Sequence, residues 1–458
     1  MALLKAKNID TTTGSLFTKI ILYSIPLILS TLIQQLFNAV DIVVLGNMAD
    51  STAVAAVSAT TPITSLIVST FVGISTGTRV VLARFIGARD EENTRNVTDT
   101  SLIFSVAVGA LIAVVGFVFA PWFLDITNCP IECYDGALIY VRIYMLSAPF
   151  IMLYNFGSAI ITADGDTQRP LYYIMIAGVT NVVLNIILCL CLEEKVAAVA
   201  IATVASQVIS AFLVSFRLLS IEGACRVNIL RMRFGIGALG KVLAAGLPMA
   251  LVHALFPLSN LQIQSAINSH GVAAIAGNGA VSTIESVVSA FTGPIGTSAS
   301  VFIGQNIGAK KRDRVKRSFW MCMLFAVVIG GGIGVFTYLT GRFWLSLIVG
   351  ADAAAIEYGL TRMFCTTLFH VVAAINGVFA SAILAHGFSV ASAINSIFSV
   401  FVFRVVWMQT VYPKSETFWS IVVCFIVSWA LGMMVNIVLY GFIWCGYRKK
   451  MSLPPCEE

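Results

Sequence analysis

Long apolar runs, separated by short polar segments, dominate the pattern of this chain. The runs are continuous, whereas an outer-membrane strand would alternate apolar and polar residues over about 10 positions. An α-helix crosses a bilayer with about 20 predominantly apolar residues. The pattern therefore predicts twelve transmembrane helices, at residues 20–45, 53–78, 99–122, 137–160, 171–192, 196–219, 242–267, 272–303, 319–341, 356–384, 388–412 and 417–446.

Landmarks along these runs occur twice. Pro26 and Pro248 stand in similar apolar contexts, and Gly165 and Gly387 end similar segments, each pair 222 residues apart. The tripeptides at residues 87–89 (Gly-Ala-Arg) and 308–310 (Gly-Ala-Lys) form a third pair at nearly the same offset. Such a repeat in a membrane chain is typical of a transporter whose substrate lies between the two halves.

The repeat predicts the domain organisation. Six spans per half bring the second half into the membrane from the same side as the first, so the repeats are parallel. We expect an all-α integral membrane protein with an N-terminal six-helix lobe over 1–220 and a cytoplasmic linker over 221–241. A C-terminal six-helix lobe follows over 242–447, and a short cytoplasmic tail over 448–458.

Composition supports the membrane assignment. Of 458 residues, 58% are hydrophobic and only 11% are charged, with a mean hydropathy of +0.92. A soluble domain carries about 25% charged residues, so a soluble chain of this composition would lack a polar surface. No signal-peptide pattern begins the chain, so the first span is expected to serve as the insertion signal.

The basic residues predict the orientation. Most of the 28 Lys and Arg residues lie in one set of loops, and the opposite loops hold only Lys195, Arg342 and Lys414. The positive-inside rule then places both termini in the cytoplasm of a multi-pass protein of the cell (inner) membrane. The net charge of +6 indicates orientation and contact with anionic membrane lipid, and does not indicate a nucleic-acid partner.

Polar residues inside spans are costly and therefore candidates for function. Asp41 lies in the outer part of the first span; it is either a residue near the headgroups or a carboxylate that binds a cation or a proton. Asn181 and Asn185 share one face of the fifth span, and Thr203 lies in the sixth. Their oxygens suit Na⁺ if they cluster with Asp41, and otherwise they hold helices together.

The second half has its own candidates. Glu285 lies halfway along the eighth span, where it either pairs structurally with Arg404 of the eleventh span or binds a cationic substrate. His253 is more typical of a core histidine than of a proton relay. Four more polar side chains could line a cavity beside Glu285: Gln34, Gln262, Gln264 and Arg404.

The remaining chemistry is limited. Cys129 and Cys133 lie in an outside loop, where the alternatives are a disulfide and two free thiols. No phosphate-binding loop, His-Glu-x-x-His motif or Gly-x-Ser-x-Gly motif occurs, so we expect neither an enzyme nor a bound cofactor. Asp164 and Asp166 are an acidic pair near a membrane face, and we interpret them as a turn before a helix.

Together these motifs resemble the multidrug and toxic compound extrusion (MATE) family over nearly the whole chain. The residues that carry the resemblance are Pro26 with Val40-Asp41, the two Gly-Ala-basic tripeptides, Gly165-Asp166-Thr167, Asn181-x-x-x-Asn185, Ala202-Thr203 and Arg404.

The resemblance implies a V-shaped pair of lobes that acts as a monomer. It implies export of bulky, often cationic, small organic compounds by alternating access, as an antiporter driven by Na⁺ or H⁺. It places the cation site at Asp41, Asn181, Asn185 and Thr203. Members commonly have aspartate where this chain has Asn185, so the site has a single carboxylate here. The alternative function is a flippase for a lipid-linked oligosaccharide or a related amphipathic substrate.

Overall fold

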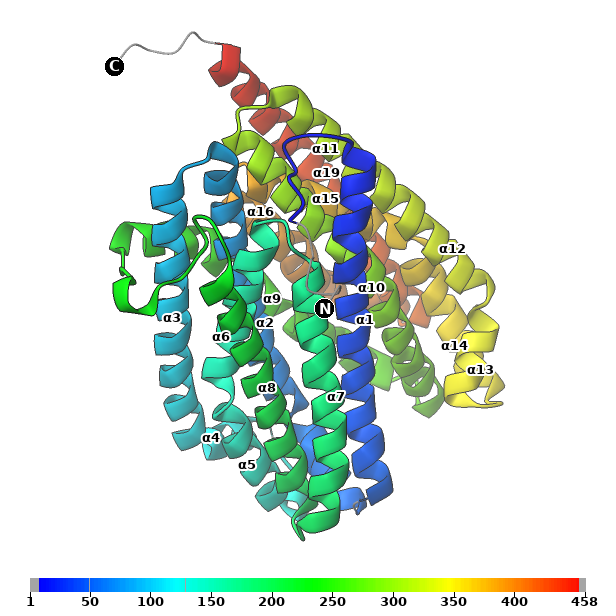
Figure 1. Ribbon diagram of the computed structural model, residues 1–458. Coiled ribbons are helices and arrows are strands. Elements are labelled where there is room, and N and C mark those ends of the chain that lie inside the picture. Colours follow the sequence, from blue (N-terminus) through cyan, green and yellow to red (C-terminus); the bar gives the residue numbers. More distant parts are fainter. Residues whose placement is uncertain (1–7, 49, 128, 453–458) are drawn as a thin grey trace. The chain divides into compact units, whose positions relative to one another are not determined.

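A computed structural model describes residues 8–48, 50–127 and 129–452, and nearly all of this part of the chain is helical (Figure 1). Eleven helices are long and apolar enough to cross a membrane, and one bent helix pair makes up to twelve. The prediction of an all-α membrane protein with twelve spans is thus confirmed. The first half holds α1 (Leu16–Met48), α2 (Ser51–Ala88), α3 (Glu91–Val118), α4 (Ala120–Ile126), α5 (Ile131–Met145), α6 (Ala148–Ala163), α7 (Gln168–Cys191) and α8 (Lys195–Ser220).

The second half follows a short 3₁₀ turn, η2 (Ile229–Arg231). Three of its spans contain a π-helical turn, labelled η3, η4 and η5, which the sequence did not predict. The elements are α9 (Ile236–Asn268), α10 (Val272–Gly308), α11 (Arg312–Phe325), η3 (Ala326–Gly330), α12 (Gly331–Leu339), α13 (Gly341–Val349), α14 (Ala353–Met363), η4 (Phe364–Leu368), α15 (His370–Ala385), α16 (Ser389–Ser396), η5 (Ile397–Val402), α17 (Phe403–Thr410), α18 (Tyr412–Ser415) and α19 (Phe418–Ser452).

The fourth predicted run is broken. Its residues form α5 and α6, which meet at an angle of 47°. Pro149 stands in the first turn of α6, where its missing N–H costs no helical hydrogen bond. A Cβ on Gly109 of α3 would lie 2.5 Å from the Cα of Pro149, so α3 packs directly on this bend.

Backbone geometry repeats with the sequence. Arg89 and Lys310 both end a span with positive φ, at 57° and 54°, a left-handed conformation that few non-glycine residues adopt. Gly165 and Gly387 have φ values of 98° and 96°. The two halves therefore end their second and fourth spans in the same way, as the recurring motifs predicted.

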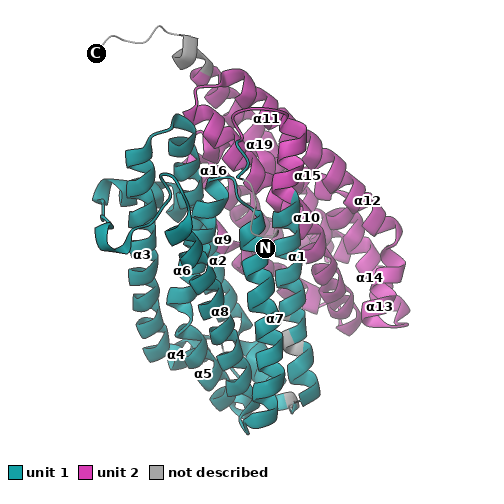
Figure 2. Cartoon of the chain, in the orientation of Figure 1, with its two compact units in different colours: residues 1–10, 25–250 teal, residues 11–24, 251–458 magenta. Residues whose placement is uncertain are grey.

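The chain divides into two compact units (Figure 2). Unit 1 comprises residues 1–10 and 25–250, and unit 2 comprises 11–24 and 251–458. This division differs from the sequence boundaries, because the first turns of α1 belong with the second half and the linker with the first. The chain crosses between the units after Asp10 and again within α1 and α9, beside Pro26 and Pro248.

Residues of the expected linker pack on unit 1. Cys225 and Val227 are buried in a cluster with Val97 of α3 and Leu218 of α8. The backbone N–H of Gly235 donates to the hydroxyl of Thr100 at 3.0 Å. The apolar residues within this polar stretch explain why it folds onto the lobe.

Candidate functional site

Three of the four residues predicted for the cation site, Asn181, Asn185 and Thr203, lie on α7 and α8. Asn181 and Asn185 are buried, and Nδ2 of Asn185 donates to Oδ1 of Asn181 at 3.2 Å. Thr203 donates its hydroxyl to the carbonyl of Val199 at 2.9 Å, as helical threonines often do. The side chain of Asp41 lies outside the described part of the structure, although its backbone belongs to α1.

A side chain of α1 packs on α7 close to this asparagine pair. A Cβ on Gly178 of α7 would overlap the ring of Phe37 of α1, so the two helices approach through a glycine. Position 41 is one turn beyond Phe37, and Asn181 is about one turn beyond Gly178. Because α1 and α7 are the first and fifth spans of a chain that crosses the membrane in alternating directions, both turns are expected to lead in the same direction.

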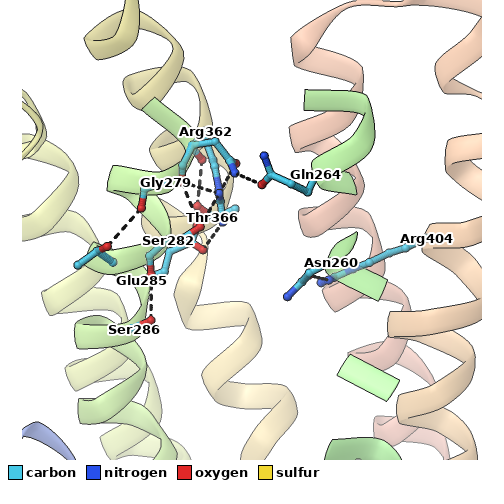
Figure 3. A network of polar contacts seen from close by, with 11 residues as sticks. Asn260, Gln264, Gly279, Ser282, Glu285, Ser286, Arg362, Thr366 and Arg404 are labelled. Carbon is cyan, nitrogen blue, oxygen red and sulfur yellow. Dashed lines mark hydrogen bonds and ion pairs between the residues drawn. The ribbon is translucent and has the colours of Figure 1, made fainter. Parts of the chain in front are cut away.

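A second polar network lies wholly within unit 2 and contains a largely buried ion pair (Figure 3). Glu285 of α10 pairs with Arg362 of α14, with Oε2 and Nη2 2.6 Å apart. The side chains of Arg362 and Glu285 are 6% and 20% exposed, so both ions are largely removed from solvent. The sequence-based interpretation that Glu285 forms a structural ion pair with Arg404 is wrong, because the carboxylate pairs with Arg362 instead.

Arg362 organises the neighbouring side chains. Its Nη1 donates to the carbonyl of Asn278 and to the hydroxyl of Ser282, both at 2.9 Å, and also to Oδ1 of Asn278. Nδ2 of Asn278 donates to Oε1 of Gln264 at 2.8 Å, which ties α9 to the same group. Of the predicted cavity residues, Glu285 and Gln264 therefore belong to one network.

One oxygen of this network is not engaged. Oε1 of Glu285 is buried and has no hydrogen-bond partner among the described residues. A buried carboxylate oxygen without a donor is costly. A proton or a bound cation would relieve that cost.

Arg404 forms a separate arrangement at the start of α17. It is 1% exposed, and its Nε and Nη1 donate to Ser428 and Asn260, each at 3.2 Å. Its guanidinium lies 4.6 Å from the ring centroid of Phe425, and that of Arg362 lies 5.4 Å from the same ring. Both buried guanidinium groups thus lie within cation–π distance of one ring.

The π-helical turns flank both arginines. Arg362 lies two residues before the start of η4, and Arg404 lies two residues after the end of η5. A π turn inserts one residue into a helix and changes the direction of the side chains beyond it, frequently at functional sites. Both buried arginines therefore lie within two residues of such a turn.

The other predicted residues are placed as follows. Gln34, Gln262 and His253 are exposed on their helices. The sulfur atoms of Cys129 and Cys133 lie 3.9 Å apart, which leaves two thiols, since a disulfide has sulfur atoms about 2 Å apart. Burial, followed by the hydrogen bond to Cys133, raises the pKa of Cys129 to about 11.

Sequence reasoning missed Arg362, Asn278 and Ser282. Asn278, Ser282 and Glu285 recur at helical spacing, and this was the available signal for a polar face on α10. The contact with Arg362 depends on how α10 and α14 pack, and spacing does not show it.

Buried charges inside twelve spans, on two repeats with the same backbone turns, define a multi-pass membrane protein of the transporter class. The sequence profile of the MatE family matches the chain twice, at residues 26–187 and 248–408, one match in each half. The chain belongs to the MatE family of membrane transporters.

Individual proteins and a solved structure are also similar to this chain. The "Probable multidrug resistance protein YoeA" of Bacillus subtilis is 26% identical over 445 residues, which cover 94% of each chain. The "FAD transporter" of Shewanella oneidensis is 25% identical and covers 60% of this chain and 62% of its own. The solved structure "Crystal structure of MATE in the bent conformation" has a TM-score of 0.90 at 19% identity, covering 98% of this chain and all of that one.

Proposed function

We propose that this protein exports bulky, often cationic organic compounds across the cell membrane in exchange for Na⁺ or H⁺. The free Oε1 of Glu285 is the observation that carries this proposal, because it offers a proton or a cation a place inside the membrane. The names of the relatives as multidrug resistance proteins support the substrate class.

Two carboxylates are proposed to serve coupling. Asp41 would bind the coupling ion with the oxygens of Asn181, Asn185 and Thr203. Glu285 would change its pairing with Arg362 when a proton or cationic substrate arrives. Coupling needs the ion and the substrate to favour different conformations of the protein, since a ligand with equal affinity for both shifts nothing.

Transport by purified protein in liposomes tests the proposal. An Na⁺ gradient and a pH gradient are imposed separately, and movement of the cation ethidium is followed for wild type, Asp41→Asn and Glu285→Gln. Glu357→Gln is the matched control, because Glu357 is an exposed carboxylate on α14, the helix that carries Arg362. We expect one gradient to drive transport, with both buried variants at least about tenfold slower and the control unchanged.

The alternatives are measured in the same assay. Transport that ignores both gradients, or that survives Asp41→Asn, would overturn coupling at that carboxylate and favour the flippase. Unchanged ethidium transport by Glu285→Gln would remove Glu285 from the mechanism. Flavin adenine dinucleotide is included as an anionic test substrate, because one relative is named "FAD transporter".

A further inference from the structure

A groove in unit 2 is separate from the polar network. It measures about 750 Å³ and lies between the first turn of α1 and nearly the whole length of α11. Its lining residues are Gly14, Ser15, Leu16, Phe17, Asp313, Arg314, Lys316, Arg317, Trp320, Met321 and Leu324. Figure 2 shows the start of α1 beside α11 within this unit.

Arg314 builds one wall of the groove. Its Nη1 donates to the carbonyl of Gly14 at 3.0 Å, and its Nη2 donates to those of Thr11 and Thr13 at 2.9 Å. These bonds fix the segment before α1 against α11. The wall is therefore formed by hydrogen-bonded backbone and does not depend on apolar packing alone.

One end of the groove is basic. Arg314, Lys316 and Arg317 line it, with Asp313 as the single acid among its lining residues. Since Arg314 is engaged with backbone carbonyls, the exposed side chains of Lys316 and Arg317 are the groups that can reach a ligand. This end suits an anion.

The other end is apolar and open. Phe17, Trp320 and Leu324 are 50%, 59% and 49% exposed, and they lie next to one another along the two helices. Residues 313, 317, 320 and 324 recur at helical spacing, so charge gives way to apolar surface along one stripe of α11. Tryptophan at such a transition is typical of the membrane–water interface.

We propose that this groove binds one anionic phospholipid from the leaflet that the N-terminus faces. The phosphate would lie on Lys316 and Arg317, and an acyl chain would lie along Trp320, Met321 and Leu324. A free phosphate would leave the apolar half of the groove uncovered, and a neutral lipid would leave the basic half without a partner. The distribution of Lys and Arg residues assigns this leaflet to the cytoplasmic side.

Native mass spectrometry of the full-length protein in detergent tests the site. Phosphatidylglycerol and phosphatidylcholine with identical chains are titrated separately, and the dissociation constant of the first bound lipid is measured. The variant Lys316→Gln/Arg317→Gln removes two charges from the groove. The matched control Arg226→Gln/Arg231→Gln removes two exposed charges from the linker region.

We expect one tightly bound phosphatidylglycerol, with phosphatidylcholine weaker. The groove variant should weaken phosphatidylglycerol roughly 20-fold, because each basic residue near an anionic headgroup contributes to binding, whereas the control should match wild type. Equal effects of the two double variants, or equal affinity for the two lipids, would overturn the proposal.

A second variant tests the apolar half. Leu324→Gln should lower the affinity for long-chain phosphatidylglycerol and leave the affinity for a short-chain form nearly unchanged. If glycerol 3-phosphate displaces the lipid as effectively as phosphatidylglycerol itself, the groove is an anion site without a lipid chain, and the proposal fails. These readouts do not depend on transport, so they stand apart from the proposed function.

Discussion

Asp164 caps the C-terminal end of α6, where its surroundings disfavour the ionised carboxylate. Burial, and then the neighbouring charge of Asp166, raise its pKa to about 7, against smaller opposing contributions from Arg217 and from the hydrogen bond donated by Asn8. The interpretation of this acidic pair as a turn fits the C-terminal position of Asp164 on α6. The residue therefore matters for pH dependence, and the sequence pattern did not indicate this.

Asp164→Asn should change the pH dependence of stability. A raised pKa means that the folded state binds the proton more tightly, so this contribution to stability is complete below about pH 4 and is lost as pH rises through 7. The variant should match wild type only below about pH 4 and be more stable at pH 8 by about 2–4 kcal/mol.

Thermal unfolding in detergent across this pH range measures the effect. Asp135→Asn is the control, because Asp135 is an exposed carboxylate of the same unit. Parallel curves for wild type and Asp164→Asn would contradict the expectation.

Arg362→Gln should destabilise unit 2. The substitution leaves the carboxylate of Glu285 in a largely buried position without its cation, and breaking such a pair costs about 3–5 kcal/mol. The double variant Arg362→Gln/Glu285→Gln should recover most of this loss, since no uncompensated charge remains. Thermal midpoints of wild type, both single variants and the double variant measure the coupling, and additive single effects would show that the pair contributes nothing.

At the scale of elements, the sequence predicted nearly everything that depends on apolar length. All twelve spans were found, and their ends shifted mainly because helices extend into polar segments, as α2 does through Arg79 and Arg84 to Ala88. The π turns and the bend between α5 and α6 were not predicted. They depend on how neighbouring helices pack, and hydropathy averages over such local changes.

Small residues allow the backbones of α2 and α9 to approach closely in unit 1. A Cβ on Gly77 of α2 would lie 2.5 Å from the backbone N of Gly246 of α9, and a Cβ on Gly246 would lie 2.5 Å from the carbonyl oxygen of Ile74. Close backbone approach of this kind is typical of helix pairs in membranes. A side chain at either position would force the helices apart.

Gly246→Ala should therefore lower the thermal midpoint of the protein, with a cost of about 1–3 kcal/mol for the overpacked contact. Gly240→Ala is the matched control on the same helix, α9, because a Cβ there meets no atom within 4 Å. The control should be neutral or stabilising, since alanine favours the helix by about 1 kcal/mol over glycine. Equal effects of the two substitutions would show that the α2–α9 contact tolerates separation.

At the scale of the whole molecule, the repeat was the part most fully predicted. Two matches to one family profile, similar φ values at Arg89 and Lys310, and similar φ values at Gly165 and Gly387 all follow the offset seen in the sequence. The side-chain contacts within the candidate sites were harder to predict from the sequence. Glu285 was recognised by its position in a span, but its partner Arg362 is 77 residues away and is brought close only by tertiary packing.

Orientation in the membrane follows from the same topology and is open to direct measurement. Six spans per half and the clustered basic residues predict that the segment between α7 and α8 lies outside the cell and the segment after α8 inside. Glu193 and Glu222 are exposed glutamates in these two segments, which makes them a matched pair for substitution by cysteine.

A membrane-impermeant maleimide added to intact cells should modify the Glu193→Cys protein and spare the Glu222→Cys protein. Inside-out vesicles should give the reverse result, and permeabilised cells should allow both reactions, which controls for the reactivity of each thiol. Peptide mass spectrometry separates each introduced site from native cysteines such as Cys191, which is also exposed. Labelling of Glu222→Cys in intact cells would invert the topology and would move the lipid groove at the start of α11 to the opposite leaflet.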